Sequence, residues 1–150
     1  MKKFVTVWML MLLAMVPLAI TQEKHDSAWE QTRRVAEAQH EVVALAIRQN
    51  NFSQVLPEMR KIFELKFPAK YELTLSREIE IVADALMHKK QYELAHQCID
   101  EGLKYLTVNQ NKSRVLQQKA YILVKQGKED EALKYFKQAM ELAKNPTTSQ

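Results

Sequence analysis

Histidine, cysteine and the carboxylates are the side chains of this chain that could bind a metal ion or take part in catalysis. His40 and Glu41 resemble the first half of the zinc motif HExxH, in which two histidines on one helical face hold the ion. Ala44 stands where the second histidine is needed. His96 and Cys98 are two residues apart, so on a helix they point about 200° away from one another. The pattern therefore predicts no metal site and no cofactor.

Other catalytic patterns are also missing from the sequence. Two glycines are too few for a phosphate-binding loop, and the serines lie in no nucleophile-type turn. Carboxylates such as Glu78, Glu80 and Asp84 alternate with basic residues, which is typical of solvated helix faces. We therefore predict that the protein is not an enzyme.

The charge balance and the cysteine content exclude further classes. Lysine and arginine number 22 against 18 acidic residues, a net charge of +4 that is too small and too evenly mixed for a nucleic-acid-binding protein. Cys98 is the one cysteine, so no disulfide forms within these residues. We expect it at a buried position of a helix; a disulfide with another chain is the alternative in an exported protein.

The chain begins with a segment typical of protein export. Lys2 and Lys3 precede a run from Phe4 to Ile20 in which Thr6 is the one polar residue. As a helix these 17 residues would span about 25 Å, short of a bilayer core of about 30 Å. A cleaved signal peptide and an uncleaved anchor both remain open for residues 1–21. Either one places the remainder beyond the membrane, in the periplasm or another extracytoplasmic space.

Residues 26–145 are expected to form one all-α domain, followed by a disordered tail at 146–150. Apolar residues recur at helical spacing, and two glycines and four prolines leave few helix stops. Residues 71–81 alternate like a strand, but helical spacing continues beyond them to Met87 and no second strand is available for pairing. A polar loop is expected at 107–112. The predicted helices span about 27–48, 53–67, 71–87, 91–106, 113–126 and 129–143.

Small residues recur along these helices at fixed offsets. Ala83 and Ala95 are 12 residues apart, and Gly102 follows seven residues later. The other two sets are Val43, Val55 and Ile62, and Ala120, Ala132 and Ala139. The sets are offset by 40 and 37 residues. Small side chains let two helices approach closely, so the spacing predicts three stacked antiparallel hairpins.

The chain resembles the tetratricopeptide repeat family over roughly residues 36–146. The last copy matches through Gly127, Ala132, Phe136 and Ala139, the middle copy through Tyr92, Ala95, Gly102 and Leu103, and the first through Phe52. The family's tryptophan and glycine of the first helix are absent, and the periods exceed the usual 34 or so. Another helical-repeat fold therefore stays open. The resemblance implies a short right-handed solenoid, here preceded by a hydrophobic N-terminal helix, that binds proteins.

In this family the first helix of each hairpin lines a concave groove. The matching positions are His40, Arg77, Glu80, Asp84, His88, Arg114, Gln117, Tyr121 and Lys125. A mixed polar lining with one aromatic residue suits an extended peptide or a partner helix; solvated helix faces are the alternative. The basic clamp that some members use for a terminal carboxylate is not expected, because Glu41, Ala44, Glu80 and Asp84 occupy its positions.

A second candidate surface lies on the last predicted helix. Its apolar residues are too many for a fully solvated helix, so we expect it to pack on a partner or a second copy: Leu133, Phe136, Met140 and Leu142. The favoured function is an adaptor or scaffold that binds a partner protein at the outer side of the membrane. The alternative is a membrane-anchored structural subunit that mainly self-associates through its C-terminal hairpin.

Overall fold

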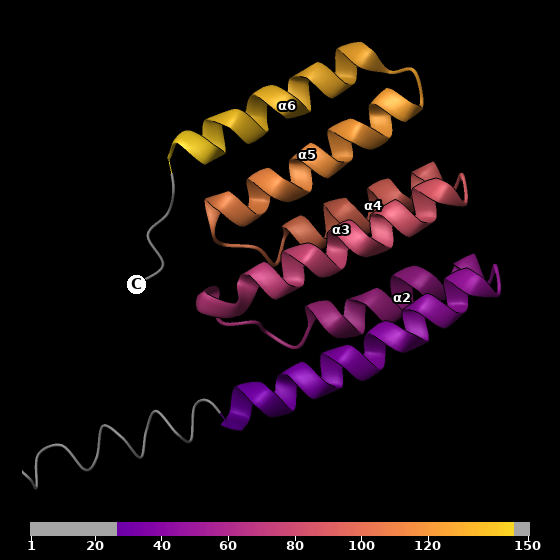
Figure 1. Cartoon of the computed structure of the whole chain (residues 1–150), viewed down its shortest axis with the longest axis vertical. Helices are drawn as coiled ribbons and strands as arrows, with labels where there is room; N and C mark the ends of the chain where they lie inside the picture. The colour runs from indigo at the N-terminus through magenta and orange to yellow at the C-terminus, as the bar shows by residue number, and fades with distance from the viewer. Residues whose placement is uncertain (1–26, 146–150) are drawn as a thin grey trace, which may run out of the picture. The chain divides into compact units, whose positions relative to one another are not determined.

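The computed structural model describes residues 27–145, and all regular structure in that range is helical (Figure 1). A helix over residues 27–48 comes first. It is followed by α2 (Phe52–Phe63), the short 3₁₀ turn η1 (Ala69–Tyr71), α3 (Glu72–His88), α4 (Tyr92–Leu103), α5 (Asn109–Lys125) and α6 (Glu129–Lys144). The all-α prediction is confirmed for this range, including the strand-like passage 71–81. The leader at 1–21 and the tail at 146–150 lie outside the described residues.

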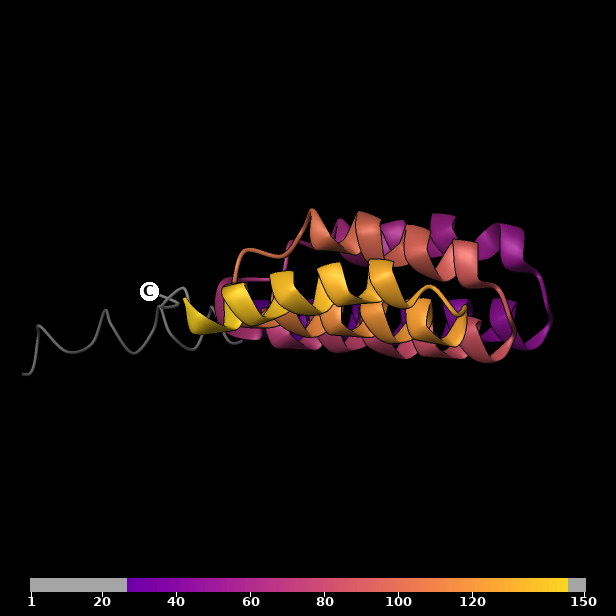
Figure 2. The ribbon, with the colours of Figure 1, turned by 90° about the horizontal axis from the view of Figure 1, so that it is seen from above.

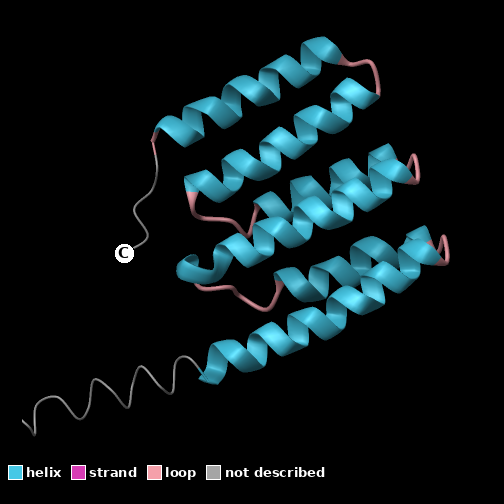
Figure 3. Ribbon diagram, in the orientation of Figure 1, coloured by secondary structure: helices cyan, strands magenta, loops and turns pink. Residues whose placement is uncertain are grey.

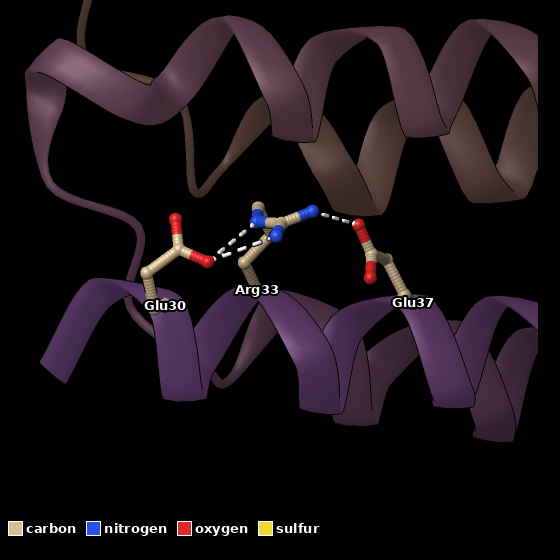
Figure 4. Close-up of polar contacts among 3 residues, drawn as sticks. All are labelled: Glu30, Arg33 and Glu37. Atoms are coloured by element: carbon tan, nitrogen blue, oxygen red, sulfur yellow. Dashed lines mark hydrogen bonds and ion pairs between the residues drawn. The ribbon is translucent and has the colours of Figure 1, made fainter. Parts of the chain in front are cut away.

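The chain divides into two compact units, Met1–Glu37 and Ala38–Gln150. In the first unit, the described residues belong to the helix over 27–48, where Arg33 lies between two carboxylates (Figure 4). Its guanidinium is 2.8 Å from Glu30 and also pairs with Glu37 one turn further on. These groups are exposed, so the pairs support the helix only weakly.

In the second unit the helices pair in chain order as antiparallel hairpins. Residues 38–48 pair with α2, where Gln39 Nε2 donates to Glu58 Oε2 over 2.6 Å. α3 pairs with α4, and α5 with α6. Contacts between α2 and α4 and between α3 and α5 stack the hairpins in two layers (Figure 2). No helix in the described range is both long and apolar enough to cross a membrane.

The three hairpin turns lie at the same end of their helix pairs (Figure 3) and share one backbone geometry. Asn50, Lys90 and Gly127 adopt left-handed φ values of 58°, 59° and 74°. In each turn the next residue's N–H donates to a carbonyl five residues back, over 2.8–2.9 Å. This is the Schellman ending of an α-helix. The turns are 40 and 37 residues apart, so the periods predicted from small residues are confirmed by the backbone.

The small residues lie where the helices of each hairpin meet. Ala83, Ala95, Ala120, Ala132 and Ala139 are all buried. Gly102 of α4 is the tightest position, because a Cβ added there would come within 2.5 Å of Ile79 Cδ1 on α3. The expectation that small side chains permit close helix packing is therefore confirmed.

Helix α5 begins at Asn109, four residues earlier than predicted. Glu72, the first residue of α3, is buried and accepts hydrogen bonds from both Thr107 N–H and Oγ1 and from Val108 N–H, over 2.6–2.8 Å. Asn111 Nδ2 adds a bond of 3.3 Å. The carboxylate thus satisfies donors at the start of α5, where a negative charge is favoured by the helix dipole. Residues 109–112, predicted as loop, are helical for this reason.

Two other predicted helices end earlier than their apolar pattern suggests. α2 stops at Phe63 rather than Phe67, because Lys66 takes a left-handed φ of 54° before Pro68. α4 stops at Leu103 rather than Leu106. The side chain of Leu106 is nonetheless buried in the core. Its apolar character is therefore explained by core packing and does not indicate that the helix continues.

A buried lysine joins the second and third hairpins. Lys119 Nζ of α5 lies 2.5 Å from Asp100 Oδ1 of α4 and 4.5 Å from the ring centroid of Tyr135 of α6. Burial alone would lower the pKa of Lys119, but its hydrogen bonds with Asp100 and Tyr135 outweigh it and raise the pKa above the usual value. The lysine therefore stays charged and holds α4, α5 and α6 together.

Candidate interaction surfaces

An apolar hollow lies between residues 38–48 and α3, on the side of the first helices. Ile81, of which 56% is exposed, is one of the residues that line it. The hollow encloses about 190 Å³ and is lined by His40, Ala44, Ile47, Arg48, Ile81, Val82 and Ala85. A shallower hollow continues on the other side of Ile81 along Glu80, Asp84, His88 and Gln118. We call these two hollows together the Ile81 groove.

The polar groups of the Ile81 groove are held in place by neighbours. His40 Nδ1 and Glu78 Oε1 lie 2.6 Å apart and link the helix over 38–48 to α3. Arg114 of α5 donates to Glu80 over 2.9 Å. These contacts hold His40 and Glu80 beside the apolar residues that line the groove.

The structure brings together four of the nine predicted groove residues. His40, Glu80, Asp84 and His88 line the Ile81 groove, and the Asp84 and His88 side chains lie 3.3 Å apart. Their ligand-binding role remains a prediction.

The other predicted groove residues have different surroundings. Arg114 does not line the groove but donates to Glu80, which does, and Gln117 donates to Ser113 Oγ over 3.3 Å. Tyr121 packs edge-on against Phe136 of α6, with ring centroids 5.2 Å apart. Arg77 and Lys125 are exposed on α3 and α5.

The apolar part of the groove was missed by the sequence reasoning. Ala44, Ile81 and Ala85 lie on it, whereas the predicted groove residues are all polar or aromatic. A signal was present: Ile81 falls between the buried stripe residues Ile79 and Val82. A residue two positions from a stripe member points to another side of the helix, so an isoleucine there indicates an exposed apolar site.

The predicted C-terminal surface is partly open. Leu133 and Met140 of α6 are 51% and 56% exposed. Leu142 is half-buried and, with Leu116, borders a shallow hollow also lined by Lys137, Gln138 and Glu141. Phe136 is half-buried within its own hairpin, against Tyr121. The open part of this surface is therefore formed mainly by Leu133 and Met140.

The residues considered for chemistry are dispersed or buried. Within residues 27–145, no three histidine, cysteine or acidic side chains gather as a metal site would require. Cys98 is buried, as expected, and burial raises the pKa of its thiol to about 12 although Arg60 acts in the opposite direction. At neutral pH this thiol is protonated and unreactive in the folded protein.

Comparison with known proteins gives a match for the last hairpin. Residues 113–146 match the family model of the tetratricopeptide repeat. No curated protein matches the chain. Together with the all-helical fold, the match shows a helical repeat protein similar to the tetratricopeptide repeat type. Such repeats are generally non-catalytic and mediate protein–protein interaction.

Proposed function

We propose that the protein is an adaptor or scaffold whose Ile81 groove binds a peptide or helix of a partner protein. The observation that carries the proposal is Ile81 itself, which is exposed and lines two adjoining hollows together with both apolar and polar residues. Isolated exposed apolar residues are common, but one that lines a hollow offers a partner both contact area and shape.

The partner segment should carry one apolar anchor with polar residues on both sides. Burying a leucine- or isoleucine-sized side chain contributes about 1.5–3 kcal/mol. His40 and Arg48 line one hollow of the Ile81 groove, and Asp84 and His88 line the other. These polar groups would favour partner segments whose residues next to the anchor can pair with them, because a buried unpaired charge is unfavourable.

Site-specific photocrosslinking tests the groove. A photoreactive amino acid at position 81 of the full-length chain is expected to capture one protein reproducibly in cells. The matched control carries it at Leu73, another exposed apolar residue of α3, outside the groove. Ile81→Asp should then weaken binding of the captured segment at least tenfold, and Leu73→Asp should not. Equal capture at positions 73 and 81, or none at 81, would contradict the proposal.

We also propose that the protein acts outside the cytoplasm, either exported or anchored in the membrane through residues 4–20. The support is the sequence of the leader, a basic start followed by an apolar run. Mass measurement of the protein from soluble and membrane fractions tests this. A mass lacking about the first 21 residues indicates cleavage, an intact mass in the membrane fraction indicates an anchor, and an intact mass in the cytosol contradicts the proposal.

A second candidate function is that of a membrane-anchored structural subunit that mainly self-associates. The observation that favours it is the exposure of Leu133 and Met140 on α6. Terminal repeats of helical arrays are usually closed by a polar outer face, and these two side chains are not polar.

A further inference from the structure

The third hairpin repeats the second with a shift of 37 residues. The turn residue Lys90 corresponds to Gly127, and the close-packed residue Gly102 corresponds to Ala139. Each residue through which the second hairpin contacts the third therefore has an equivalent on the third hairpin, 37 residues later. These equivalent residues mark the surface that a further hairpin would contact.

Two side chains of α4 contact the following hairpin. His96 Nε2 lies 2.9 Å from Gln126 Oε1, and Asp100 pairs with Lys119. Shifted by 37 residues, these positions are Leu133 and Lys137 on α6. Leu133 is exposed, and Met140 corresponds to Leu103, which packs against the core. The surface formed by Leu133, Lys137 and Met140, the tail face, thus has the layout of an interhelical contact.

The opposite end of the stack carries the complementary face. α5 buries Val115, Lys119 and Ile122. Shifted back by 77 residues, the sum of the two periods, these positions are Ala38, Val42 and Leu45. Val42 and Leu45 are each 46% exposed. We call these residues the head face.

We propose that copies of this chain stack head to tail, with the head face of one copy on the tail face of the next. In this contact the helix over 38–48 of one copy would pack on the third hairpin of the next in the way that α5 packs on the second hairpin. The two helices occupy equivalent places in their hairpins, so the same packing geometry is available to both. Both faces are also more apolar than their equivalents inside the molecule: Val42 stands at the position equivalent to the charged Lys119, and Leu133 at the position equivalent to the polar His96. Lys137 can lay its stem along Val42 while its ammonium reaches water.

Such an interface joins two different surfaces and does not close on itself. The assembly should therefore lengthen with concentration instead of stopping at a dimer. A two-fold dimer, in which two tail faces meet, is the competing arrangement. The proposal is independent of the Ile81 groove, because none of the residues that line the groove belongs to either face.

Crosslinking between two differently tagged full-length chains tests the stacking. One chain carries Gln49→Cys and the other Leu133→Cys, which correspond to the Gln126 and His96 pair inside the molecule. With a short bis-maleimide, we expect a product carrying both tags, at least tenfold above either homodimer. Cys98 is buried and should give no product in the unmodified chain.

Two variants serve as controls. Lys104→Cys, at an exposed site outside the tail face, should not crosslink when it replaces Leu133→Cys. Val42→Lys, added to the Gln49→Cys chain, should reduce the mixed product at least tenfold without changing the helical circular dichroism. A predominant Leu133→Cys homodimer, or no crosslinked product, would overturn the proposal. Photocrosslinking at position 81 would be unaffected in both cases.

Discussion

Glu72 is a buried carboxylate that stabilises a helix start far away in the sequence. It is 1% exposed, and its hydrogen bonds to Thr107, Val108 and Asn111 hold the start of α5 against α3. Burial alone would raise the pKa of Glu72, but these hydrogen bonds together outweigh it and lower the pKa below its usual value. The ionised form is therefore the one that the fold stabilises.

Replacing Glu72 by glutamine should lower the free energy of unfolding by about 1–3 kcal/mol, because the amide NH₂ would face donors in place of an acceptor. Urea unfolding at pH 7 measures this, with Glu64→Gln, at an exposed site, as the neutral control. The lowered pKa predicts that the stabilisation is fully present above pH 4.5 and is lost as the pH falls through the folded-state pKa. A difference between the wild type and Glu72→Gln that persists at low pH would contradict this assignment.

The hairpin turn is the element that repeats most faithfully. Each turn places one residue in the left-handed region, and no side chain caps the helix that follows. Gly127 adopts this conformation without strain, but for Lys90 it costs about 1–2 kcal/mol.

Lys90→Gly should therefore raise the free energy of unfolding by about 0.5–1 kcal/mol, after allowing for the extra freedom of glycine in the unfolded chain. The neighbouring Lys89 has a φ of −83°, so Lys89→Gly should be destabilising by a similar amount. Parallel urea titrations of the two variants measure the difference. Equal effects of the two substitutions would show that the turn conformation does not control stability.

At this scale the sequence predicted most of the fold. Small residues at matched offsets correctly located the hairpin crossings, because close helix approach tolerates few side chains. The start of α5 was not predictable locally, since its first donors are satisfied by Glu72, 35 residues away. The floor of the groove was missed for a related reason. The spacing of Ile81 from Ile79 places it off the buried stripe of α3, but which helix borders that side of α3 depends on the fold and is not encoded in the sequence pattern of α3.

For the whole molecule, coupling between hairpins depends in part on Lys119. Asp100→Asn would leave its ammonium buried beside Tyr135 without a negative partner. Since Asp100 is half exposed, we expect a loss of about 1–2 kcal/mol, less than for a fully buried pair. Lys119→Met removes the buried charge, so no negative partner is needed. The free energy of unfolding of this variant should stay within about 1 kcal/mol of the wild-type value.

Equilibrium unfolding of both variants checks this asymmetry, and a larger loss for Lys119→Met would refute it. The raised pKa of Lys119 adds a pH dependence. Its stabilisation is fully present below the ordinary value of 10.5 and is lost as the pH rises through the folded-state value. The wild type should therefore lose this part of its stability in alkali, whereas Lys119→Met should not.

The left-handed turns have a consequence for how such a protein can change in evolution. Because Asn50, Lys90 and Gly127 join their helices through the same main-chain bonds, a gene segment cut at two of them encodes a complete unit with matching ends. Duplication or deletion between these points would alter the number of units while preserving every junction. Length is then a modular property of this architecture, free to vary in steps of 37 to 40 residues as partners of different size are acquired.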